Sequence, residues 1–318
     1  MENNLVSVII ATKNEGNNIE NCLKSAVFQT YKNIEIIVVD NNSADDTKKI
    51  ARKYTDIVFN KEPKRSVQSN YAVDISKGKY IFHADADMVL APELIDSCIQ
   101  NAVKYQDVIG FYIPEIVLGK SFWSKVRRFE RGFYDGTAID AVRFFYKDAF
   151  VKINGYDEEM LWGPDDWDLD RRLSEVGKLK MISDSESFAK TDNAYNNVEN
   201  LTKWHNAFDR FLEERGVTDA ALSERNILFH NESEFNFKKY MAKKGVYSKS
   251  FSQYISKWGN NDSIIRKQFG IPYRYFIVFL ENGKWKRLLG RPFLTMGMYF
   301  LRVMVGIKYL ESKFLKVL

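Results

Sequence analysis

The residues best suited to chemistry lie in the segment Tyr80–Leu90, which reads YIFHADADMVL. Its first residues have strand character, and Asp85 and Asp87 follow with Ala86 between them. In an extended backbone, residues two apart point to the same side, so the two carboxylates would face one point. A divalent cation relieves the repulsion between two such anions, and oxygen ligands favour Mg²⁺ or Mn²⁺. Taken alone, the same pair could simply cap and solubilise the end of a strand.

The N-terminal half alternates strand-like and helix-like segments that would position these acids. Near-continuous apolar runs at Leu5–Ala11 and Ile34–Val39 are typical of parallel strands buried on both faces. A third, short strand is expected at Asp56–Asn60, and helical spacing of apolar residues marks Asn18–Gln29 and Ser66–Lys77. This order predicts an α/β fold with a mostly parallel central sheet flanked by helices.

Polar residues follow three of the expected strands at their carboxyl ends. They are the loop Thr12–Glu15, the loop Asp40–Asn42, and the pair Asp85 and Asp87. Because ligands of open parallel sheets bind beyond the carboxyl ends of the strands, we expect these residues to share one site. The asparagines of these loops could instead only shape turns, and Asp40 could cap a helix.

Length and composition indicate a globular protein of 318 residues, 45% hydrophobic, with six prolines. The two cysteines, Cys22 and Cys98, lie far apart with no metal-binding spacing, which fits a reducing cytoplasm. The N-terminal residues MENNLVSVII have no basic region and are not typical of a signal peptide. No run of eighteen uncharged apolar residues is present, so no membrane-spanning helix is expected.

Positive charge is concentrated near the end of the chain. The formal net charge is +5, and residues 281–318 carry eight basic and two acidic side chains. The apolar block Phe293–Leu301 is too short to cross a bilayer and is closed by Arg302. We expect helices that lie on an anionic membrane surface, with packing on the catalytic domain or dimerisation as alternatives. No zinc-finger spacing or RNA-binding strand motif is present, so no nucleic-acid partner is expected.

Three segments, SVIIATKNEG, IIVVDNNSADDT and GKYIFHADADMVL, resemble the N-terminal half of family 2 glycosyltransferases. The resemblance implies a GT-A fold whose first two loops hold a nucleotide-diphosphate sugar of the UDP or GDP type. It also implies that the D-x-D segment holds Mg²⁺ or Mn²⁺ on the donor diphosphate. By matching position, the donor-binding residues would be Ala11, Thr12, Asn14, Glu15, Asp40, Asn42, Arg65, Gln68, Asn70 and Ala86, and the metal ligands Asp85 and Asp87.

The segment Leu161–Leu173, LWGPDDWDLDRRL, resembles the family's G-x-E-D-x-D-L-x-x-R segment, whose second acid is the general base. That acid matches Asp166. An acceptor hydroxyl must lose its proton as it attacks the anomeric carbon, and in-line attack inverts the configuration. The structural alternative is an anion stabilised by the dipole of a helix in its first turn. The remaining candidates on the acceptor side are Arg143, Trp162, Asp165, Trp167 and Arg172.

The segment His230-Asn231-Glu232 resembles the H-x-E segment of the family, which makes His230 the third candidate metal ligand. A polar, amphipathic stretch at about 184–226 precedes it and is expected to be a helical insertion. His205, within that insertion, and His83 are expected to be structural. The expected division of the chain is a catalytic domain over 1–235 and a basic, amphipathic helical region over 236–318.

Together these features predict an inverting, metal-dependent glycosyltransferase, peripheral on the inner face of the cell membrane. The acceptor would be a polyprenyl-phosphate- or diphosphate-linked glycan, or another precursor of a cell-surface glycan. The alternative is a non-catalytic glycan-binding or scaffold protein of the same fold at the membrane. A nucleotidyltransferase is disfavoured, because the loop TKNEG has one glycine where a glycine-rich phosphate loop would be needed.

Overall fold

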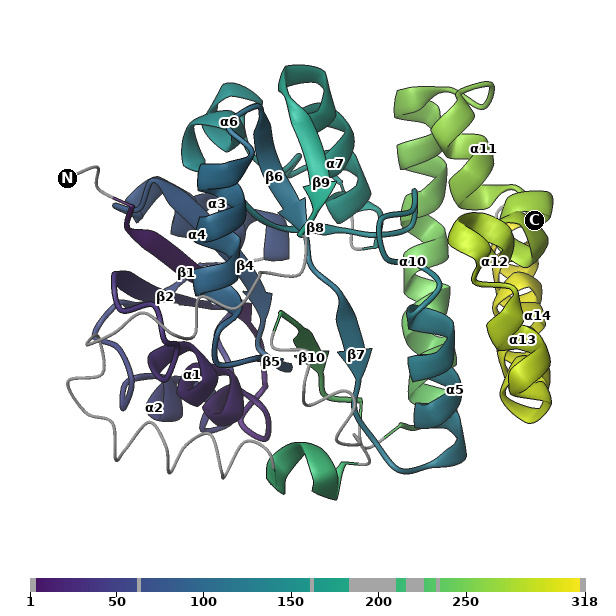
Figure 1. The fold of residues 1–318 in the computed structure, drawn as a ribbon, viewed down its shortest axis with the longest axis horizontal. Coiled ribbons are helices and arrows are strands. Elements are labelled where there is room, and N and C mark those ends of the chain that lie inside the picture. Colours follow the sequence, from purple (N-terminus) through teal and green to yellow (C-terminus); the bar gives the residue numbers. More distant parts are fainter. Residues whose placement is uncertain are drawn as a thin grey trace.

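The computed structural model describes residues 4–61, 64–160, 163–182, 210–215, 226–232 and 235–314. A sheet with helices on both faces forms the larger part, and the helices nearest the C-terminus form a layer beside it (Figure 1). Residues of the sheet and of this layer together line one cavity, so both parts shape it.

A seven-stranded sheet has the order β3-β2-β1-β4-β8-β6-β9. Its strands are β1 Val6–Thr12, β2 Ile34–Asp40, β3 Val58–Asn60, β4 Tyr80–Asp85, β6 Val108–Tyr112, β8 Val142–Tyr146 and β9 Lys178–Met181. All neighbours pair in parallel except β8, which is antiparallel to β4 and β6. The expected mostly parallel α/β sheet is confirmed. Thr12 pairs with Asp40 and Ala11 pairs with Asp85, so three strands end at one edge.

Helices cover the two faces of this sheet. They are α1 Ile19–Val27, α2 Thr47–Ala51 and α4 Leu94–Lys104 on one face, and α3 Arg65–Ile75, α6 Lys147–Lys152 and α7 Asp165–Val176 on the other. Strand β1 shows why both faces are apolar, because successive side chains point to opposite faces. Val8 and Ile10 pack with α1 and α4, whereas Ile9 packs with α3 and α7.

A second, three-stranded sheet corrects one expectation. It has the order β5-β10-β7, with β5 at Met88–Leu90, β7 at Glu115–Val117 and β10 at Leu228–His230. The apolar pattern predicts one strand over 108–117, whereas β6 and β7 belong to different sheets. Pro114 lies between them and has no N–H to donate to a ladder, which favours the break. Antiparallel pairing of β10 with β5 places His230 beside Met88, close to the acids of the D-x-D segment.

The C-terminal layer consists of helices that pack on helix α5 and on one another, and α10 and α14 are the longest helices that the structure describes (Figure 1). Their bounds are α5 Phe122–Arg131, α10 Phe237–Trp258, α11 Ser263–Phe269, the π-helix η1 Tyr273–Ile277, α12 Val278–Leu280, the 3₁₀-helix η2 Glu281–Gly283, α13 Lys286–Gly290 and α14 Pro292–Phe314. Close approach of α14 to α5 requires glycine at position 297, where a Cβ would lie 2.7 Å from Val126 Cγ2.

Helix α14 is longer than the sequence pattern indicates. Arg302 was expected to close an apolar block, but the helix continues through it to Phe314. The reason is that the Arg302 side chain is buried and donates a hydrogen bond to Glu130 at 3.0 Å, so its charge does not face an apolar medium. By length and composition alone, the 20 residues Pro292–Glu311 are long and apolar enough to cross a membrane.

The expected helical insertion at about 184–226 lies mostly outside the described residues. Within it the structure describes a short helical segment over 210–215, and strand β10 follows at Leu228. His205 and Trp162 also lie outside the described residues. The division of the chain near residue 235 therefore stays a prediction.

Candidate active site

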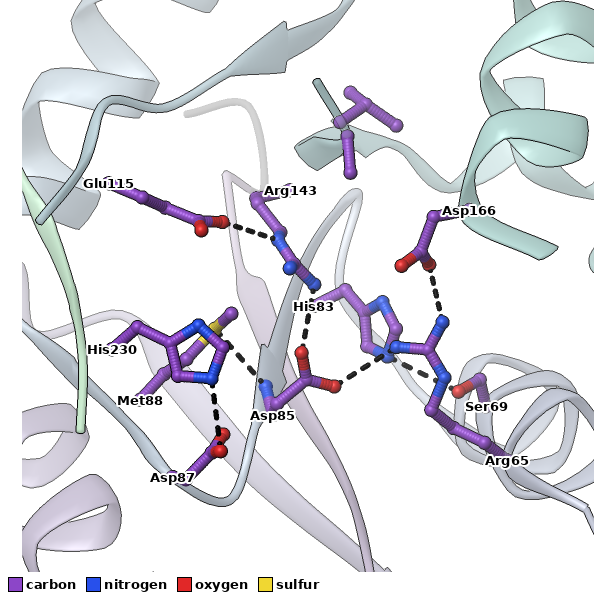
Figure 2. Close-up of polar contacts among 12 residues, drawn as sticks. Arg65, Ser69, His83, Asp85, Asp87, Met88, Glu115, Arg143, Asp166 and His230 are labelled. Atoms are coloured by element: carbon purple, nitrogen blue, oxygen red, sulfur yellow. Dashed lines mark hydrogen bonds and ion pairs between the residues drawn. The ribbon is translucent and has the colours of Figure 1, made fainter. Parts of the chain in front are cut away.

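Asp85 ends strand β4 and lies between two arginines (Figure 2). Arg65, the first residue of α3, donates to its Oδ1 at 3.0 Å, and Arg143 on β8 donates to its Oδ2 at 3.3 Å. Arg143 also donates to Glu115 on β7 at 3.3 Å. Burial alone would raise the pKa of Asp85, but Arg143 and Arg65 hold it well below its usual range. Asp85 is therefore an anion whose charge is balanced by two guanidinium groups.

Asp87 faces a different partner, because the strand does not extend to it. Residues 86 and 87 form a turn before β5, so the expectation of two carboxylates on one side of an extended strand is wrong. Its Oδ2 atom lies 3.0 Å from His230 Nε2 (Figure 2). Burial lowers the pKa of His230, but the Asp87 carboxylate more than offsets this and raises it to about 9.

The chemistry of this acidic region fits a hard divalent cation. Among the residues that the structure describes, no three His, Cys, Asp or Glu side chains lie close enough to form a metal shell. A third carboxylate lies near this pair: burial raises the pKa of Glu15, and the charges of Asp87 and Asp85 raise it further. Carboxylate oxygens are the donors that Mg²⁺ and Mn²⁺ prefer, and an imidazole nitrogen suits Mn²⁺ better than Mg²⁺. Asp85, Asp87 and His230 are thus suitable ligands in kind.

Arg65 joins this acidic region to the second acidic segment. Its Nη2 atom donates to Asp165 Oδ2 at 2.8 Å and to Asp166 Oδ1 at 2.7 Å, while Nη1 holds Asp85. Asp165 and Asp166 open helix α7, as the sequence predicts, and the helix N-terminus further favours their negative charge. The predicted base and the predicted metal ligand therefore lie on the same guanidinium group, in one site.

The structure distinguishes the two neighbouring acids of α7. The Asp165 side chain is 3% exposed, whereas that of Asp166 is 21% exposed. Burial raises the pKa of Asp165, with Asp166 raising it further. Burial also opposes ionisation of Asp166, but Arg65 and Arg143 lower its pKa below the ordinary value. Asp166 is therefore the more accessible member of the pair, and its pKa is the one that is lowered.

Three buried side chains behind Asp166 were not recognised from the sequence. The Tyr156 hydroxyl donates to Asp166 Oδ1 at 3.2 Å and lies 2.8 Å from His83 Nδ1. His83 Nε2 lies 3.3 Å from the hydroxyl of Ser69 on α3. Burial, followed by the charge of Arg65, lowers the pKa of His83 to about 4, so this ring is neutral. The signal in the sequence was the polar His83 within an otherwise apolar strand, which was expected to be structural.

The two donor loops are tied together by their own side chains. Asn14 and Asn42 have left-handed φ angles of 54° and 46°, which asparagine tolerates better than most residues, so both shape turns as the alternative interpretation proposed. Asn14 Oδ1 also accepts from the backbone N–H of Ala44 at 2.9 Å. Asp40 is fully buried and accepts hydrogen bonds from the backbone and hydroxyl of Ser43. These residues hold the edge of the sheet in shape.

Three of the remaining donor candidates lie at the strand ends. Ala11 pairs with Asp85 across the sheet, and Ala86 is buried in the turn that follows. The hydroxyl of Thr12 is buried and has no hydrogen-bond partner within the described chain, so a ligand is the remaining partner for it. Gln68 donates to the carbonyls of Thr12 at 3.1 Å and Val39 at 2.6 Å, and so joins β1 to β2.

Three other predicted site residues support the site from outside it. The Asn70 side chain makes hydrogen bonds to both backbone groups of Tyr156 and to Glu158. Arg172 donates to Asp168 at 2.8 Å and to two backbone carbonyls of the loop before Tyr156. Trp167 donates to the carbonyl of Ile139 at 3.1 Å and packs among aromatic rings of α10 and α11. In this structure these three residues hold loops and helices in place.

Comparisons with known proteins agree with this geometry. Residues 7–157 match the family model described as Glycosyl transferase family 2. A chondroitin synthase of Pasteurella multocida is 26% identical over 199 residues, which cover 56% of this chain and 20% of that protein. A UDP-Glc:alpha-D-GlcNAc-diphosphoundecaprenol beta-1,3-glucosyltransferase of Escherichia coli, WfaP, is 43% identical over 88 residues, covering 26% of this chain and 35% of that protein. The matches thus span only a part of these relatives.

A solved structure shows the same fold. The mannosyltransferase PcManGT from Pyrobaculum calidifontis, in complex with GDP-Man and Mn²⁺, aligns with a TM-score of 0.53 and 15% identity, covering 96% of this chain and 86% of that one. The expected GT-A type of α/β fold is confirmed. Since the matched segment contains the D-x-D acids, both donor loops and Arg65, residues 7–157 of this chain form a glycosyltransferase family 2 domain.

Proposed function

We propose that this protein is an inverting glycosyltransferase that moves a sugar from a nucleotide-diphosphate sugar to an acceptor hydroxyl. The observation that carries the proposal is the position of Asp166, an accessible, ionised carboxylate held by the same arginine as Asp85. A donor diphosphate near Asp85 would thus lie close to a group that can take a proton. Relatives that act on sugars support the reaction class.

Asp166 is the proposed general base. It would accept the proton of the acceptor hydroxyl as that oxygen attacks the anomeric carbon. Tyr156 donates to one carboxylate oxygen and fixes its orientation, so the other oxygen is the one available to the acceptor. Attack from the Asp166 side, opposite the leaving diphosphate, inverts the anomeric configuration.

The donor would occupy the edge where β1, β2 and β4 end. Thr12, with its unpartnered hydroxyl, and Glu15 are the residues proposed to contact the nucleoside, while Asp40 shapes the loop around it. Arg65 is proposed to face the donor diphosphate. The nucleotide would be of the UDP or GDP type, as in the Pyrobaculum complex with GDP-Man and the UDP-glucose named for WfaP.

Asp85, Asp87 and His230 are the proposed ligands of Mg²⁺ or Mn²⁺. Bound there, the cation would neutralise charge on the donor diphosphate and on the leaving nucleotide. His230 has to release its proton to act as a ligand, so metal binding competes with the Asp87–His230 ion pair. The Mn²⁺ of the Pyrobaculum complex supports divalent metal use in this fold.

The proposed acceptor is a glycan linked to a polyprenyl phosphate or diphosphate. The name of WfaP describes an acceptor linked to diphosphoundecaprenol. Such an acceptor lies at a membrane, so the protein would work on the inner face of the cell membrane as a peripheral protein. The outer surface of the C-terminal layer provides the physical argument for this location.

Exposed apolar side chains gather on that surface, on the segments from η1 to α14. They are Phe276, Ile277, Leu280, Trp285, Leu289, Phe293, Met296, Phe300, Val303, Ile307 and Leu310. Basic residues such as Lys286 and Arg291 lie among them. An apolar face with interspersed basic side chains suits helices that lie on an anionic bilayer. Helix α14 therefore packs on α5 and α10 with one side and exposes the other.

Vesicle binding tests this location. The double variant Leu289→Ser with Phe293→Ser should partition about tenfold to a hundredfold less onto anionic vesicles, because two large side chains no longer enter the bilayer. The matched control is Val103→Ser, which changes an exposed apolar residue of α4. A wild-type protein that does not sediment with anionic vesicles would contradict the location.

The variant Asp166→Asn tests the enzymatic proposal. Transfer should fall by about a hundredfold to ten-thousandfold, while the affinity for the nucleotide diphosphate stays near that of the wild type. Asp165→Asn should retain more transfer activity than Asp166→Asn. Full turnover by Asp166→Asn would show that the base is assigned to the wrong residue.

A further inference from the structure

A cavity of about 330 Å³ lies between the catalytic sheet and the C-terminal layer. Its wall is formed by α5, the start of α7, α10, η1 and α14, and includes Asp166 and Arg143 of the active site. The cavity therefore begins at the proposed base and extends away from the donor edge. A molecule that presents a hydroxyl to Asp166 would have its adjoining group in this space.

The wall of the cavity carries more positive than negative charge. Six basic residues line it, against three acidic ones, and three of the basic residues also form ion pairs with acids outside the lining. The basic residues are Arg127, Arg131, Arg143, Lys244, Arg274 and Arg302. Burial, followed by the charges of Arg127 and Lys243, lowers the pKa of Lys244 to about 7, as expected where cations crowd.

Three of these arginines have a buried Nη1 atom without a hydrogen-bond acceptor among the described residues, and Arg131 Nη1 lies 3.6 Å from the carboxylate of Asp135, which leaves Arg274 and Arg302. Arg302 is 6% exposed and uses Nε for Glu130 and Nη2 for the Tyr134 hydroxyl, but its buried Nη1 has no hydrogen-bond partner in the described chain. Arg274 Nη1 is also buried without a hydrogen-bond partner there, and no carboxylate of the described residues forms an ion pair with it. Buried charged donors that lack an acceptor are costly, so they indicate a ligand with acceptor oxygens.

Tyrosine side chains also line the cavity. They are Tyr247, Tyr275 and Tyr309, and the hydroxyl of Tyr275 donates to the carbonyl of Arg302 at 2.8 Å. At Gly306, a Cβ would lie 2.8 Å from the Tyr275 hydroxyl, so glycine there leaves room for that group beside α14. The unpartnered donors of Arg274 and Arg302 come from two separate elements, η1 and α14, which suits a multi-oxygen anion better than a planar carboxylate bound at one edge.

We propose that this cavity binds the phosphate or diphosphate group of the acceptor, with Arg274 and Arg302 as its principal anion-binding residues. The inference rests on the proposed function, because it uses the position of Asp166 to orient the acceptor. The unpartnered Nη1 atoms of Arg274 and Arg302 match the acceptor oxygens of a phosphate or diphosphate. Two sources of this chemistry exist: a lipid-linked diphosphate and a soluble phosphate-bearing glycan.

Calorimetric titration with inorganic pyrophosphate tests the cavity directly. The wild-type protein is titrated in the presence of a chelator and saturating UDP, so that the donor edge is occupied and free of metal. Binding is expected, and Arg274→Gln should weaken it by about tenfold to a hundredfold, because a charge-assisted hydrogen bond is lost. The matched control is Arg291→Gln, which removes an exposed guanidinium from the same layer and should bind as the wild type does.

Arg302→Lys is the second variant and should also weaken binding, since a lysine cannot serve Glu130, Tyr134 and a ligand together. Thermal unfolding checks that each variant is folded. If Arg302→Lys does not fold, the pyrophosphate affinity of Arg274→Gln alone tests the proposal. Equal affinity of the wild type and Arg274→Gln for pyrophosphate would overturn the proposal. So would an absence of binding by the wild type. Because no sugar is transferred in this titration, its failure would leave the Asp166→Asn test standing.

Farnesyl diphosphate as a second titrant distinguishes the two sources. If the wild type binds farnesyl diphosphate more tightly than pyrophosphate, and Arg274→Gln weakens the binding of both, the proposal is supported with a lipid-linked acceptor. Equal binding of the two, also lost in Arg274→Gln, would support it with a soluble phosphate-bearing glycan. Binding of farnesyl diphosphate that Arg274→Gln leaves unchanged would overturn the role of the arginines.

Discussion

The donor edge and the acceptor cavity are built in different ways. At the donor edge, residues such as Asp40, Asn14 and Gln68 bond to nearby backbone, and most polar groups are satisfied within two adjoining loops. In the cavity, polar groups come from helices far apart in the chain, and Arg274 and Arg302 keep unmatched donors. Most polar groups of the edge are thus satisfied by the chain itself, whereas the cavity keeps donors that the proposed acceptor phosphate would satisfy.

Metal removal should have the largest effect of all the tests, and it should act on sugar transfer at the donor edge but not on binding in the cavity. A chelator is expected to lower sugar transfer by three to four orders of magnitude, because the charge on the leaving diphosphate is no longer neutralised. Added Mn²⁺ or Mg²⁺ should restore sugar transfer in the wild type but not in the Asp87→Asn variant. Pyrophosphate binding in the cavity should be unaffected. Chelator-resistant transfer would contradict the metal assignment.

Glu130→Gln should destabilise the cavity side strongly. Glu130 accepts hydrogen bonds from Arg127 at 2.6 Å, the Tyr134 hydroxyl at 2.6 Å and Arg302 at 3.0 Å. Burial would raise its pKa, but Arg302 and Arg127 lower it to about 2. The loss of this carboxylate leaves buried cations unpaired and should lower the free energy of unfolding by about 3 kcal/mol at pH 7.

The pH dependence of that loss provides a sharper test. A carboxyl group with a lowered folded-state pKa stabilises the protein above its unfolded pKa, and this contribution is lost as the pH falls through the folded value. The difference between wild type and Glu130→Gln in urea unfolding should therefore shrink between about pH 4.5 and about pH 2. The control Glu311→Gln changes an exposed acid and should have little effect. A difference that does not change with pH would contradict the assigned charge.

Gly297→Ala should have a smaller effect on the same side. The new Cβ would lie 2.7 Å from Val126 and 3.0 Å from Phe122, so α14 must move away from α5. We expect a loss of about 1 to 2 kcal/mol in the free energy of unfolding, although alanine is the better helix former. Gly290→Ala, with no atom near the new Cβ, should be neutral or stabilising. Equal effects of the two changes would argue against tight packing of α14.

Tyr156→Phe should have the smallest effect, at the border between the two regions. It removes the hydrogen bond to Asp166 and the contact with His83, while the ring packing is kept. The turnover number should fall about threefold to tenfold, with little change in the KM for the donor. The control Tyr54→Phe removes a distant tyrosine hydroxyl bonded to Glu20. An unchanged turnover number would show that Asp166 needs no such support.

The comparison also explains what could be predicted from the sequence. Strand ends are visible as apolar runs followed by polar loops, so the mostly parallel sheet was predicted correctly, whereas Asp166 was singled out by its resemblance to a family segment and its role stays a prediction. The turn at residues 86 and 87 was missed, because an extended backbone was assumed beyond Asp85. Loop-holding roles, such as that of Asn70, depend on partners 86 residues away and leave no local pattern.

The cavity could not be predicted for a related reason. Its basic residues are spread from Arg127 to Arg302, and each resembles a solvated surface charge in the sequence. Arg302 in particular was expected to end an apolar block, whereas burial against Glu130 keeps it inside the protein. Only tertiary packing shows which charges of a basic segment are buried.

Arg65 has one further consequence for how this chain can be studied. A single guanidinium group neutralises Asp85 on one side and Asp165 and Asp166 on the other. A substitution at position 65 therefore alters leaving-group departure and nucleophile activation at once. Under the proposed mechanism, kinetic changes in such a variant cannot be assigned to attack or to departure alone, and they require double-mutant cycles with Asp85 and with Asp166 to be apportioned.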